Sequence, residues 1–340
     1  MDNDRPVRWG VLGAARVFER RMVPAFRDAA GNELIAVASR SEAKARETAA
    51  RHGIARAYGA YEALLDDPDV DAVYIPLPND LHRTWTIRAL EAGKHVLCDK
   101  PAALSYADAV AMTEAARLAG RRLQEGFMYR HHPQHDRLQA IMASGEIGTP
   151  VEIRSVFTYL ANRADRENIR WNPTKGGGAF LDVGVYALNA ARFYFQAEPL
   201  AVTATAVIDP DSGVDLHTTA LLEFPDGRTA TITGGFDQGF CARLEIAGST
   251  GIAVADRALN IGERGVTLRF GENPEQVESF PHIDHWTAEV VHFAACVRDP
   301  SRPLWPGEDG VLQARAVEAV LRSVAEKRRV MIEEINAVPV

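Results

Sequence analysis

The sequence has little cysteine, no excess of positive charge and no long run of apolar residues. Its three cysteines, Cys98, Cys241 and Cys296, lie far apart among 340 residues, so neither a disulfide framework nor a zinc motif is indicated. The net charge of −8 argues against a nucleic-acid-binding protein, because such proteins are usually basic. No apolar stretch approaches a membrane span, and the start "MDNDRPVRWG" lacks the build of a signal peptide. We expect a cytoplasmic protein without a membrane or nucleic-acid partner.

The two halves of the sequence differ in their hydrophobic pattern. Residues 5–125 alternate short apolar runs such as "DAVYIPLP" with helix-like stretches such as "SEAKARETAARHG". This alternation is typical of βαβ units around a parallel sheet. After about residue 150, longer runs rich in Val, Ile and Thr are joined by "FPDGR" and "GSTG", which predict antiparallel hairpins.

Three helix-like stretches interrupt or follow the strands of the second half, over 178–195, 284–299 and 307–328. The sequence therefore predicts a parallel α/β domain over 1–126. An α+β domain with a large, mostly antiparallel open sheet is predicted over 127–340.

A glycine-containing turn follows the first predicted strand, in "RWGVLGAARVF". Gly13, Ala14, Ala15 and Arg16 stand where a Rossmann domain brings its backbone close to a pyrophosphate at a helix N-terminus. The glycine pattern is incomplete, and any strand–turn–helix could contain such a turn. Its place in the first βαβ unit favours a dinucleotide site.

The end of the second predicted strand indicates which dinucleotide binds. An acid there would hold the 2′-hydroxyl of NAD, but this chain has "VASRSEAK". Ser39 and Arg40 can hold a 2′-phosphate, and Lys44 could add positive charge. We predict NADP as the cofactor, with NAD as the alternative.

The fifth apolar run ends abruptly in "LCDKPAAL", at Asp99, Lys100 and Pro101. Open α/β sheets bind their ligands beyond the carboxyl ends of the strands, which is where Lys100 is expected. Pro101 restricts the backbone at Lys100 and therefore the direction in which this side chain leaves the sheet. We predict a functional lysine, although most lysines of such loops are only solvated.

With these motifs the chain resembles the Gfo/Idh/MocA family, named after glucose–fructose oxidoreductase and inositol dehydrogenase. The matching segments are "WGVLGAARV", "YEALLDDPDVDAVYIPLPNDLHRTWTIRALEAGKHVLCDKP", "EGFMYRHHPQ", "GGGAFLDVGVYALNAARF" and "HWTAEVVHFAACV". Asp99 replaces the usual Glu of the Glu-Lys-Pro signature, and Trp286 stands where a Tyr is common.

The resemblance implies a Rossmann domain followed by an α+β domain whose sheet often forms a homo-oligomer interface. It implies that Lys100 lies beside the nicotinamide ribose and the reacting carbon. The segment "PLPNDLH" would line the cofactor, so that Pro76, Asn79, His82 and also Asp99 become cofactor-binding candidates.

"GGGAFLDVGVYALN" supplies a second catalytic candidate. Asp182, Tyr186 and Asn189 follow an i, i+4, i+7 spacing that shares one helix face. Many relatives have His at the position of Tyr186, whereas Tyr resembles the branch of glucose–fructose oxidoreductase and dimeric dihydrodiol dehydrogenases. We expect Tyr186 to act as general acid/base, helped by the Lys100 ammonium, with Asp182 orienting the substrate or Lys100.

Weaker substrate-binding candidates flank this segment: Arg130, Arg163, Arg170, Trp171 and Asn189. The histidines of "RHHPQH" include a pair four residues apart, His131 and His135, but no acidic ligand follows at a suitable spacing, so no metal site is predicted.

The sequence thus predicts an NADP-dependent oxidoreductase acting on a carbinol or carbonyl carbon of a sugar or related polyol. Aldose dehydrogenase, dihydrodiol dehydrogenase and ketosugar reductase activities remain open within that class. The alternative is a non-catalytic regulator of the same fold that senses NAD(P). Retention of Lys100, Asp182 and Tyr186 favours the enzyme, because a sensor need not keep all three.

Overall fold

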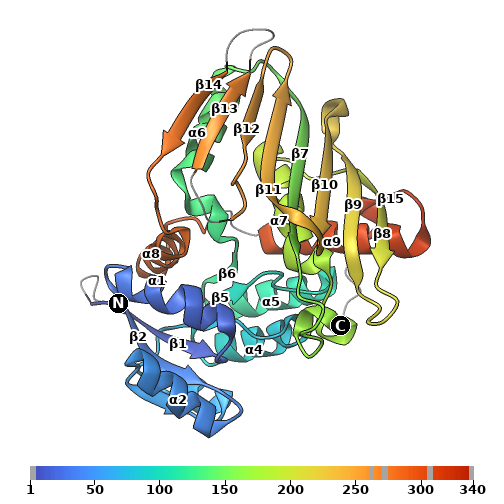
Figure 1. Ribbon diagram of the computed structural model, residues 1–340. Helices are drawn as coiled ribbons and strands as arrows, with labels where there is room; N and C mark the ends of the chain where they lie inside the picture. Colours follow the sequence, from blue (N-terminus) through green and yellow to red (C-terminus); the bar gives the residue numbers. More distant parts are fainter. Residues whose placement is uncertain (1–4, 261–263, 270–274, 305–308, 337–340) are drawn as a thin grey trace. The chain divides into compact units, whose positions relative to one another are not determined.

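The computed structural model describes residues 5–260, 264–269, 275–304 and 309–336 (Figure 1). The chain forms two compact units. The first unit comprises Met1–Ala103, Ala107–His131 and Asp284–Val311, and the second comprises Leu104–Tyr106, His132–Ile283 and Leu312–Val340.

The first unit contains a six-stranded parallel sheet in the order β3-β2-β1-β4-β5-β6. This is the doubly wound order of a Rossmann domain, with its switch point between β1 and β4. The strands are β1 (Val7–Leu12), β2 (Asn32–Ala38), β3 (Arg56–Tyr58), β4 (Ala72–Ile75), β5 (His95–Asp99) and β6 (Leu123–Gly126). The predicted parallel α/β domain is confirmed.

Helices pack on this sheet because the contact buries the apolar side chains of both the helices and the strands. They are η1 (Phe18–Met22), α1 (Val23–Asp28), α2 (Glu42–His52), α3 (Tyr61–Leu65), α4 (Asn79–Glu91), α5 (Tyr106–Ala119), η2 (Met128–His131) and α8 (His285–Arg298). The ring of Trp9 on β1 packs against Phe26 of α1 at 5.0 Å and Phe293 of α8 at 5.5 Å between centroids.

Helix α8 belongs to the first unit, although the predicted boundary at 126/127 groups it with the second half of the chain. Its residues Val290, Phe293, Ala294 and Val297 complete the core around Trp9. The apolar spacing that predicted this helix does not reveal which of two cores it completes. Tertiary packing decides that choice.

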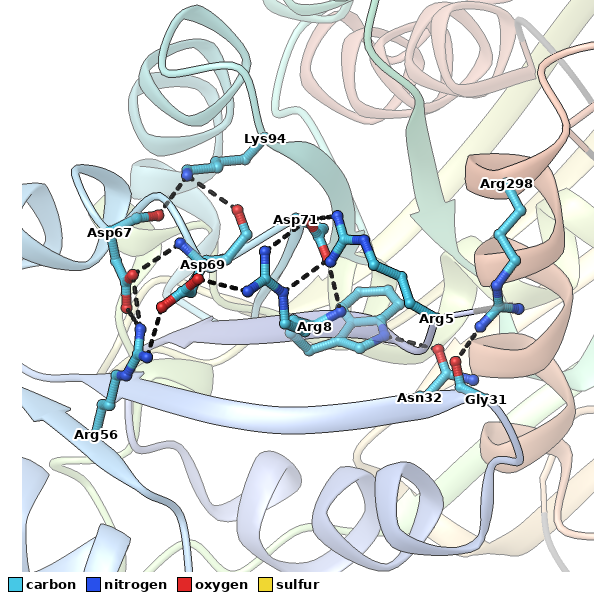
Figure 2. A network of polar contacts seen from close by, with 12 residues as sticks. Arg5, Arg8, Gly31, Asn32, Arg56, Asp67, Asp69, Asp71, Lys94 and Arg298 are labelled. Carbon is cyan, nitrogen blue, oxygen red and sulfur yellow. Dashed lines mark hydrogen bonds and ion pairs between the residues drawn. The ribbon is translucent and has the colours of Figure 1, made fainter. Parts of the chain in front are cut away.

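The amino ends of the parallel strands are joined by a network of ion pairs (Figure 2). Asp71, just before β4, accepts from Arg5 at 2.8 Å and 3.0 Å and from the Arg8 backbone N–H at 3.0 Å. Arg56 donates to Asp67 at 2.7 Å and 2.8 Å. These contacts fix the edge of the sheet opposite to the one that carries Lys100.

The second unit contains a nine-stranded sheet in the order β14-β13-β12-β11-β7-β10-β9-β8-β15. Only the β10–β7 pair of this sheet is parallel, and the described remaining pairs are antiparallel, as predicted. The strands are β7 (Pro150–Leu160), β8 (Ala201–Ile208), β9 (Asp215–Glu223), β10 (Thr229–Gly235), β11 (Asp237–Gly248), β12 (Ile252–Ala255), β13 (Arg264–Arg269), β14 (Gln276–Phe280) and β15 (Val330–Met331).

The second unit also contains several helical segments, of which η5 and α7 pack on β7 and β10. They are α6 (Pro133–Ser144), η3 (Ile169–Trp171), η4 (Pro173–Lys175), η5 (Phe180–Gly184), α7 (Val185–Phe195), α9 (Asp309–Glu326) and η7 (Ile332–Glu334), with η6 (Pro225–Gly227) in the β9–β10 turn. All residues of α7 are buried. A Cβ on Gly234 of β10 would lie 2.4 Å from the Gly184 Cα, so helix and strand touch backbone to backbone.

The three predicted helix-like stretches correspond to η5 with α7, to α8 and to α9, while residues 307 and 308 lie outside the described residues. Helix α6 is a helix that the sequence reading did not single out. Among the helices described here, none is long and apolar enough to cross a bilayer.

Candidate active site

The turn after β1 has the geometry of a dinucleotide-binding turn. Gly13 has a φ of 111°, and a Cβ there would meet the Leu77 side chain at 2.8 Å, so this position requires glycine. Its N–H donates to the Ala38 carbonyl at 2.9 Å, which ties the turn to the end of β2. A helix begins directly after this turn, and the N-terminus of a helix favours an anion.

The end of β2 presents the residues that the sequence suggested for a 2′-phosphate. Ser39 is 8% exposed and its N–H donates to the Tyr58 carbonyl at 3.0 Å. Arg40 and Lys44 are exposed. Burial raises the pKa of the Tyr61 hydroxyl, and the positive charge of Arg40 acts against this rise. No carboxylate occupies the position expected of an NAD-binding acid.

His82 ties two predicted cofactor loops together. Its Nδ1 lies 2.8 Å from the Pro101 carbonyl oxygen and its Nε2 lies 2.8 Å from the Leu77 carbonyl oxygen. The side chain is completely buried, and burial lowers its pKa. His82 thus braces the segment after β4 against the turn that carries Lys100.

Lys100 follows β5 directly and is half-buried. The backbone N–H of Lys100 donates to Asp99 Oδ1 at 2.9 Å, and the Lys100–Pro101 peptide bond is cis. The next N–H, that of Ala102, donates to Glu125 Oε1 at 2.9 Å. The turn is therefore held by Asp99, His82 and Glu125 in the first unit.

Glu289, on α8, is an acid of this region that sequence reasoning missed. It is 2% exposed, and burial raises its pKa, as does the nearby Asp99, while Arg130 lowers it. The sequence feature that could have identified Glu289 is an acidic residue among the apolar residues of "HWTAEVVHFAACV".

Asp182 lies in η5 of the second unit, where its carboxylate is firmly held. It accepts from the Tyr159 hydroxyl at 2.8 Å, from Arg170 Nε at 2.8 Å and from Arg170 Nη2 at 3.2 Å. Burial and the Asp182 charge raise the pKa of Tyr159, and Asp182 raises that of Arg170. Tyr159 was not predicted, although the alternation of β7 places it on the same face as Phe157.

The two other predicted residues of this helix differ in their surroundings. Tyr186 is 7% exposed, and its ring packs edge-on against Phe157 with centroids 5.4 Å apart. Asn189 is fully buried and its Nδ2 donates to Gln313 Oε1 at 3.1 Å. Asn189 therefore also ties α7 to α9.

The remaining substrate candidates occupy different environments. Arg163 is exposed. Trp171 is 6% exposed, and its Nε1 donates to the Asn162 carbonyl at 3.2 Å. Arg130, in the first unit, is 3% exposed and pairs with Asp309 at 2.9 Å. Trp171 and Arg130 are thus buried and hydrogen-bonded within the protein, in addition to being candidates for substrate binding.

The histidine-rich segment forms hydrogen bonds. His135 Nδ1 lies 2.5 Å from the Tyr194 hydroxyl and its Nε2 lies 3.0 Å from the Ala258 carbonyl oxygen. No group of three or more His, Cys, Asp or Glu side chains suited to a metal was found among the described residues.

The chain belongs to the Gfo/Idh/MocA oxidoreductase family. The family described as "Oxidoreductase family, NAD-binding Rossmann fold" matches residues 7–127, and the "GFO/IDH/MocA C-terminal domain" matches residues 135–254. The resemblance seen in the sequence motifs is thereby confirmed.

Relatives with named activities cover nearly the whole chain. A D-xylose 1-dehydrogenase (NADP(+)) from Haloferax volcanii is 37% identical over 93% of this chain and 96% of its own length. A dTDP-3,4-didehydro-2,6-dideoxy-α-D-glucose 3-reductase from Saccharopolyspora spinosa is 38% identical over 93% of this chain and 97% of its own.

A similar solved structure is that of a 3-ketoreductase from Actinomadura kijaniata in complex with NADP and TDP-benzene. It has a TM-score of 0.89 and 34% identity, and the match covers 94% of this chain and 98% of that one. The structures of that enzyme include one variant of a tyrosine and two variants of a lysine. The chain is accordingly an oxidoreductase that acts on hydroxyl or keto groups, and the regulatory alternative is disfavoured.

Proposed function

We propose that this protein transfers a hydride between NADP and a carbinol or carbonyl carbon of a sugar or related polyol. The observation that carries the proposal is the carboxyl edge of the parallel sheet. There the Gly13 turn, the basic end of β2 and the Lys100 turn follow the carboxyl ends of β1, β2 and β5 of one parallel sheet. The named dehydrogenase and ketoreductases support the same substrate class.

The residues at this edge fit the cofactor. Gly13 has the positive φ that this tight turn requires, and the N-terminus of the following helix favours an anion such as a pyrophosphate. Arg40 and Lys44 bring positive charge to the end of β2, and Ser39 offers a hydroxyl. When bound, the nicotinamide supplies the hydride chemistry.

Lys100 and Tyr186 act in the same reaction. Tyr186 exchanges the proton of the reacting oxygen as general acid/base, and Lys100 stabilises the negative charge that develops on that oxygen. Asp182, held by Tyr159 and Arg170, orients the substrate or Lys100.

Arg163, Arg170 and Trp171 remain candidates for substrate contact, together with Arg130 and Asn189. Arg163 is exposed, whereas Arg170 reaches any ligand only while it also neutralises Asp182. We therefore expect Arg163 to affect substrate KM more selectively than Arg170.

The sheet of the second unit supports homo-oligomer formation. On β8 and β9 the residues facing away from the buried side include Val207 and Leu221, which are 46% and 43% exposed, beside Thr203 and Thr219. We propose this exposed face as the contact between copies of the chain. A cytoplasmic location stays a prediction from the cysteine content.

The test is a Tyr186→Phe variant assayed with NADP and with NAD on a panel of aldoses, polyols and ketosugars. Turnover should fall by at least 100-fold, since general acid–base groups contribute about 10² to 10⁴, while NADPH fluorescence titration gives an unchanged Kd. Full activity of this variant would discard the role of Tyr186. Binding of NADPH without turnover of any substrate by the unmodified protein would favour a regulator.

A further inference from the structure

Glu289 is a buried carboxyl that none of the roles above uses. It lies on α8 and is 2% exposed, and its Oε1 has no hydrogen-bond partner among the residues that the structure describes. An ionised carboxylate at such a place is costly, because burial removes its water and no donor replaces that water at Oε1. Ionisable groups in this state cluster at functional sites.

Glu289 Oε1 lies beside the strand end that leads to Lys100. Gly126, the last residue of β6, pairs with Asp99, the last residue of β5. A Cβ on Gly126 would lie 3.7 Å from Glu289 Oε1, 3.2 Å from the Cys98 carbonyl oxygen and 3.7 Å from the Asp99 Cα. The glycine therefore leaves room for the carboxyl next to the last residues of β5.

The charges that act on Glu289 favour its protonated form. Burial raises its pKa well above the usual value, and the Asp99 carboxylate raises it further, whereas Arg130 lowers it. Arg130 also pairs with Asp309 at 2.9 Å, so that its charge is shared with another acid.

The other titratable groups around α8 do not supply a counter-charge. His131 of η2 and His292 of α8 stack with ring centroids 4.9 Å apart. Burial lowers the pKa of His131 to about 3, and burial also lowers that of His292. Arg21 of η1 lies over the Trp286 ring, at 5.2 Å from its centroid.

We propose that Glu289 is a positioning residue for Lys100, a neutral carboxylic acid that holds the end of β5. A protonated carboxyl donates a hydrogen bond where a carboxylate only accepts. The Cys98 carbonyl oxygen and the Asp99 carboxylate are acceptors at this strand end, and the proposal is that Glu289 donates to one of them. The positioning role rests on the catalytic role proposed for Lys100, but the proton on Glu289 can be tested without turnover.

Thermal unfolding of Glu289→Gln between pH 5 and pH 9 tests whether Glu289 carries a proton in the folded protein. In the unfolded chain Glu289 ionises near its ordinary pKa of about 4.5, whereas the folded protein keeps the proton to higher pH. The native protein therefore loses stability as pH rises between these two values, and the amide removes this loss. The Tm of Glu289→Gln minus that of the unmodified protein should therefore increase by about 3 °C for each unit by which the pH rises.

Glu91→Gln, at an exposed acid of α4, is the matched control and should show no such gain. Parallel Tm curves for Glu289→Gln and the unmodified protein would mean that Glu289 is ionised in the fold, and would overturn the proposal.

Activity separates positioning from packing. Glu289→Gln keeps a donor and should retain kcat within about twofold, whereas Glu289→Leu fills the space without a donor and should lose about tenfold in kcat, with NADPH Kd unchanged. Equal kcat for the two variants would refute the positioning role. If Lys100→Met were fully active, the proposed function would fail while the Tm result still reported the proton.

Discussion

The two edges of the parallel sheet handle charge in opposite ways. At the amino edge, Asp67 and Asp71 are closely paired with arginines from neighbouring strands (Figure 2). At the carboxyl edge, the backbone is shaped by Gly13 and His82, and Glu289 is buried without a partner for its Oε1 among the described residues. One edge is built for stability, and the other holds the groups to which we assign chemistry.

The largest expected effect is at the carboxyl edge. Lys100→Met should lower kcat by about 10³-fold, because it removes the cation that stabilises the reacting oxygen, and should leave the Tm within about 2 °C. Steady-state kinetics and thermal unfolding measure the two quantities. Lys175→Met, an exposed lysine of η4, is the matched control and should behave as the unmodified protein. Activity of Lys100→Met within tenfold of the control would contradict the proposed role.

The amino edge should respond in the opposite way. Asp71→Asn leaves Arg5 and Arg8 without their shared acid, and we expect the free energy of unfolding to fall by about 2 kcal/mol, less than for a fully buried pair because Arg5 is partly exposed. The kcat should not change. Urea unfolding at pH 7 measures the loss. A fall in kcat with unchanged stability would reverse the assignment of the two edges.

The pH dependence of the same variant sharpens this prediction. Burial raises the pKa of Asp71, but hydrogen bonds from Arg5 and Arg8 outweigh burial and hold it below its usual value. The stabilisation is therefore present above the unfolded pKa and is lost as pH falls through the folded one. The stability difference between Asp71→Asn and the unmodified protein should shrink towards pH 3.

Much of the carboxyl edge could be predicted from the sequence, because its signals are local. A glycine after a strand, a basic strand end and a proline-locked lysine each identify a position on a parallel sheet whose strand ends share one edge. The amino-edge network could not be predicted in this way. Arg56 and Asp67 are ordinary charged residues in the sequence, and only the folded chain brings the loop between α3 and β4 to the start of β3 and makes them partners.

The second unit illustrates the same limit. The spacing of Asp182 and Tyr186 identified one helix, but the partners of Asp182, Tyr159 on β7 and Arg170 in η3, come from segments whose pairing depends on sheet register. Glu289 was missed for a similar reason. A single acid in an apolar helix does not disclose whether it faces water or the interior.

The coenzyme preference should depend on the end of β2, with a smaller effect than that of Lys100. Arg40→Ser removes a charged donor to the 2′-phosphate, which corresponds to about a 20-fold rise in KM for NADP with little change for NAD. Arg46→Ser, an exposed arginine on α2 paired with Glu42, controls for loss of surface charge. An equal rise in both KM values would assign Arg40 to the shared part of the cofactor.

The smallest effect is expected at His82, and it tests whether residues at the carboxyl edge also stabilise the fold. His82 contacts both the Pro101 and the Leu77 carbonyl oxygens, so it stabilises the fold and positions the Lys100 turn together. His82→Gln keeps an amide donor, and we expect losses of about fivefold in kcat and about 1 kcal/mol in unfolding free energy. Thr84→Ala, an exposed site on α4, is the control. A loss of stability alone would show that His82, like Asp71, supports the fold and not catalysis. A loss of kcat alone would show that the two His82 contacts serve catalysis without stabilising the fold.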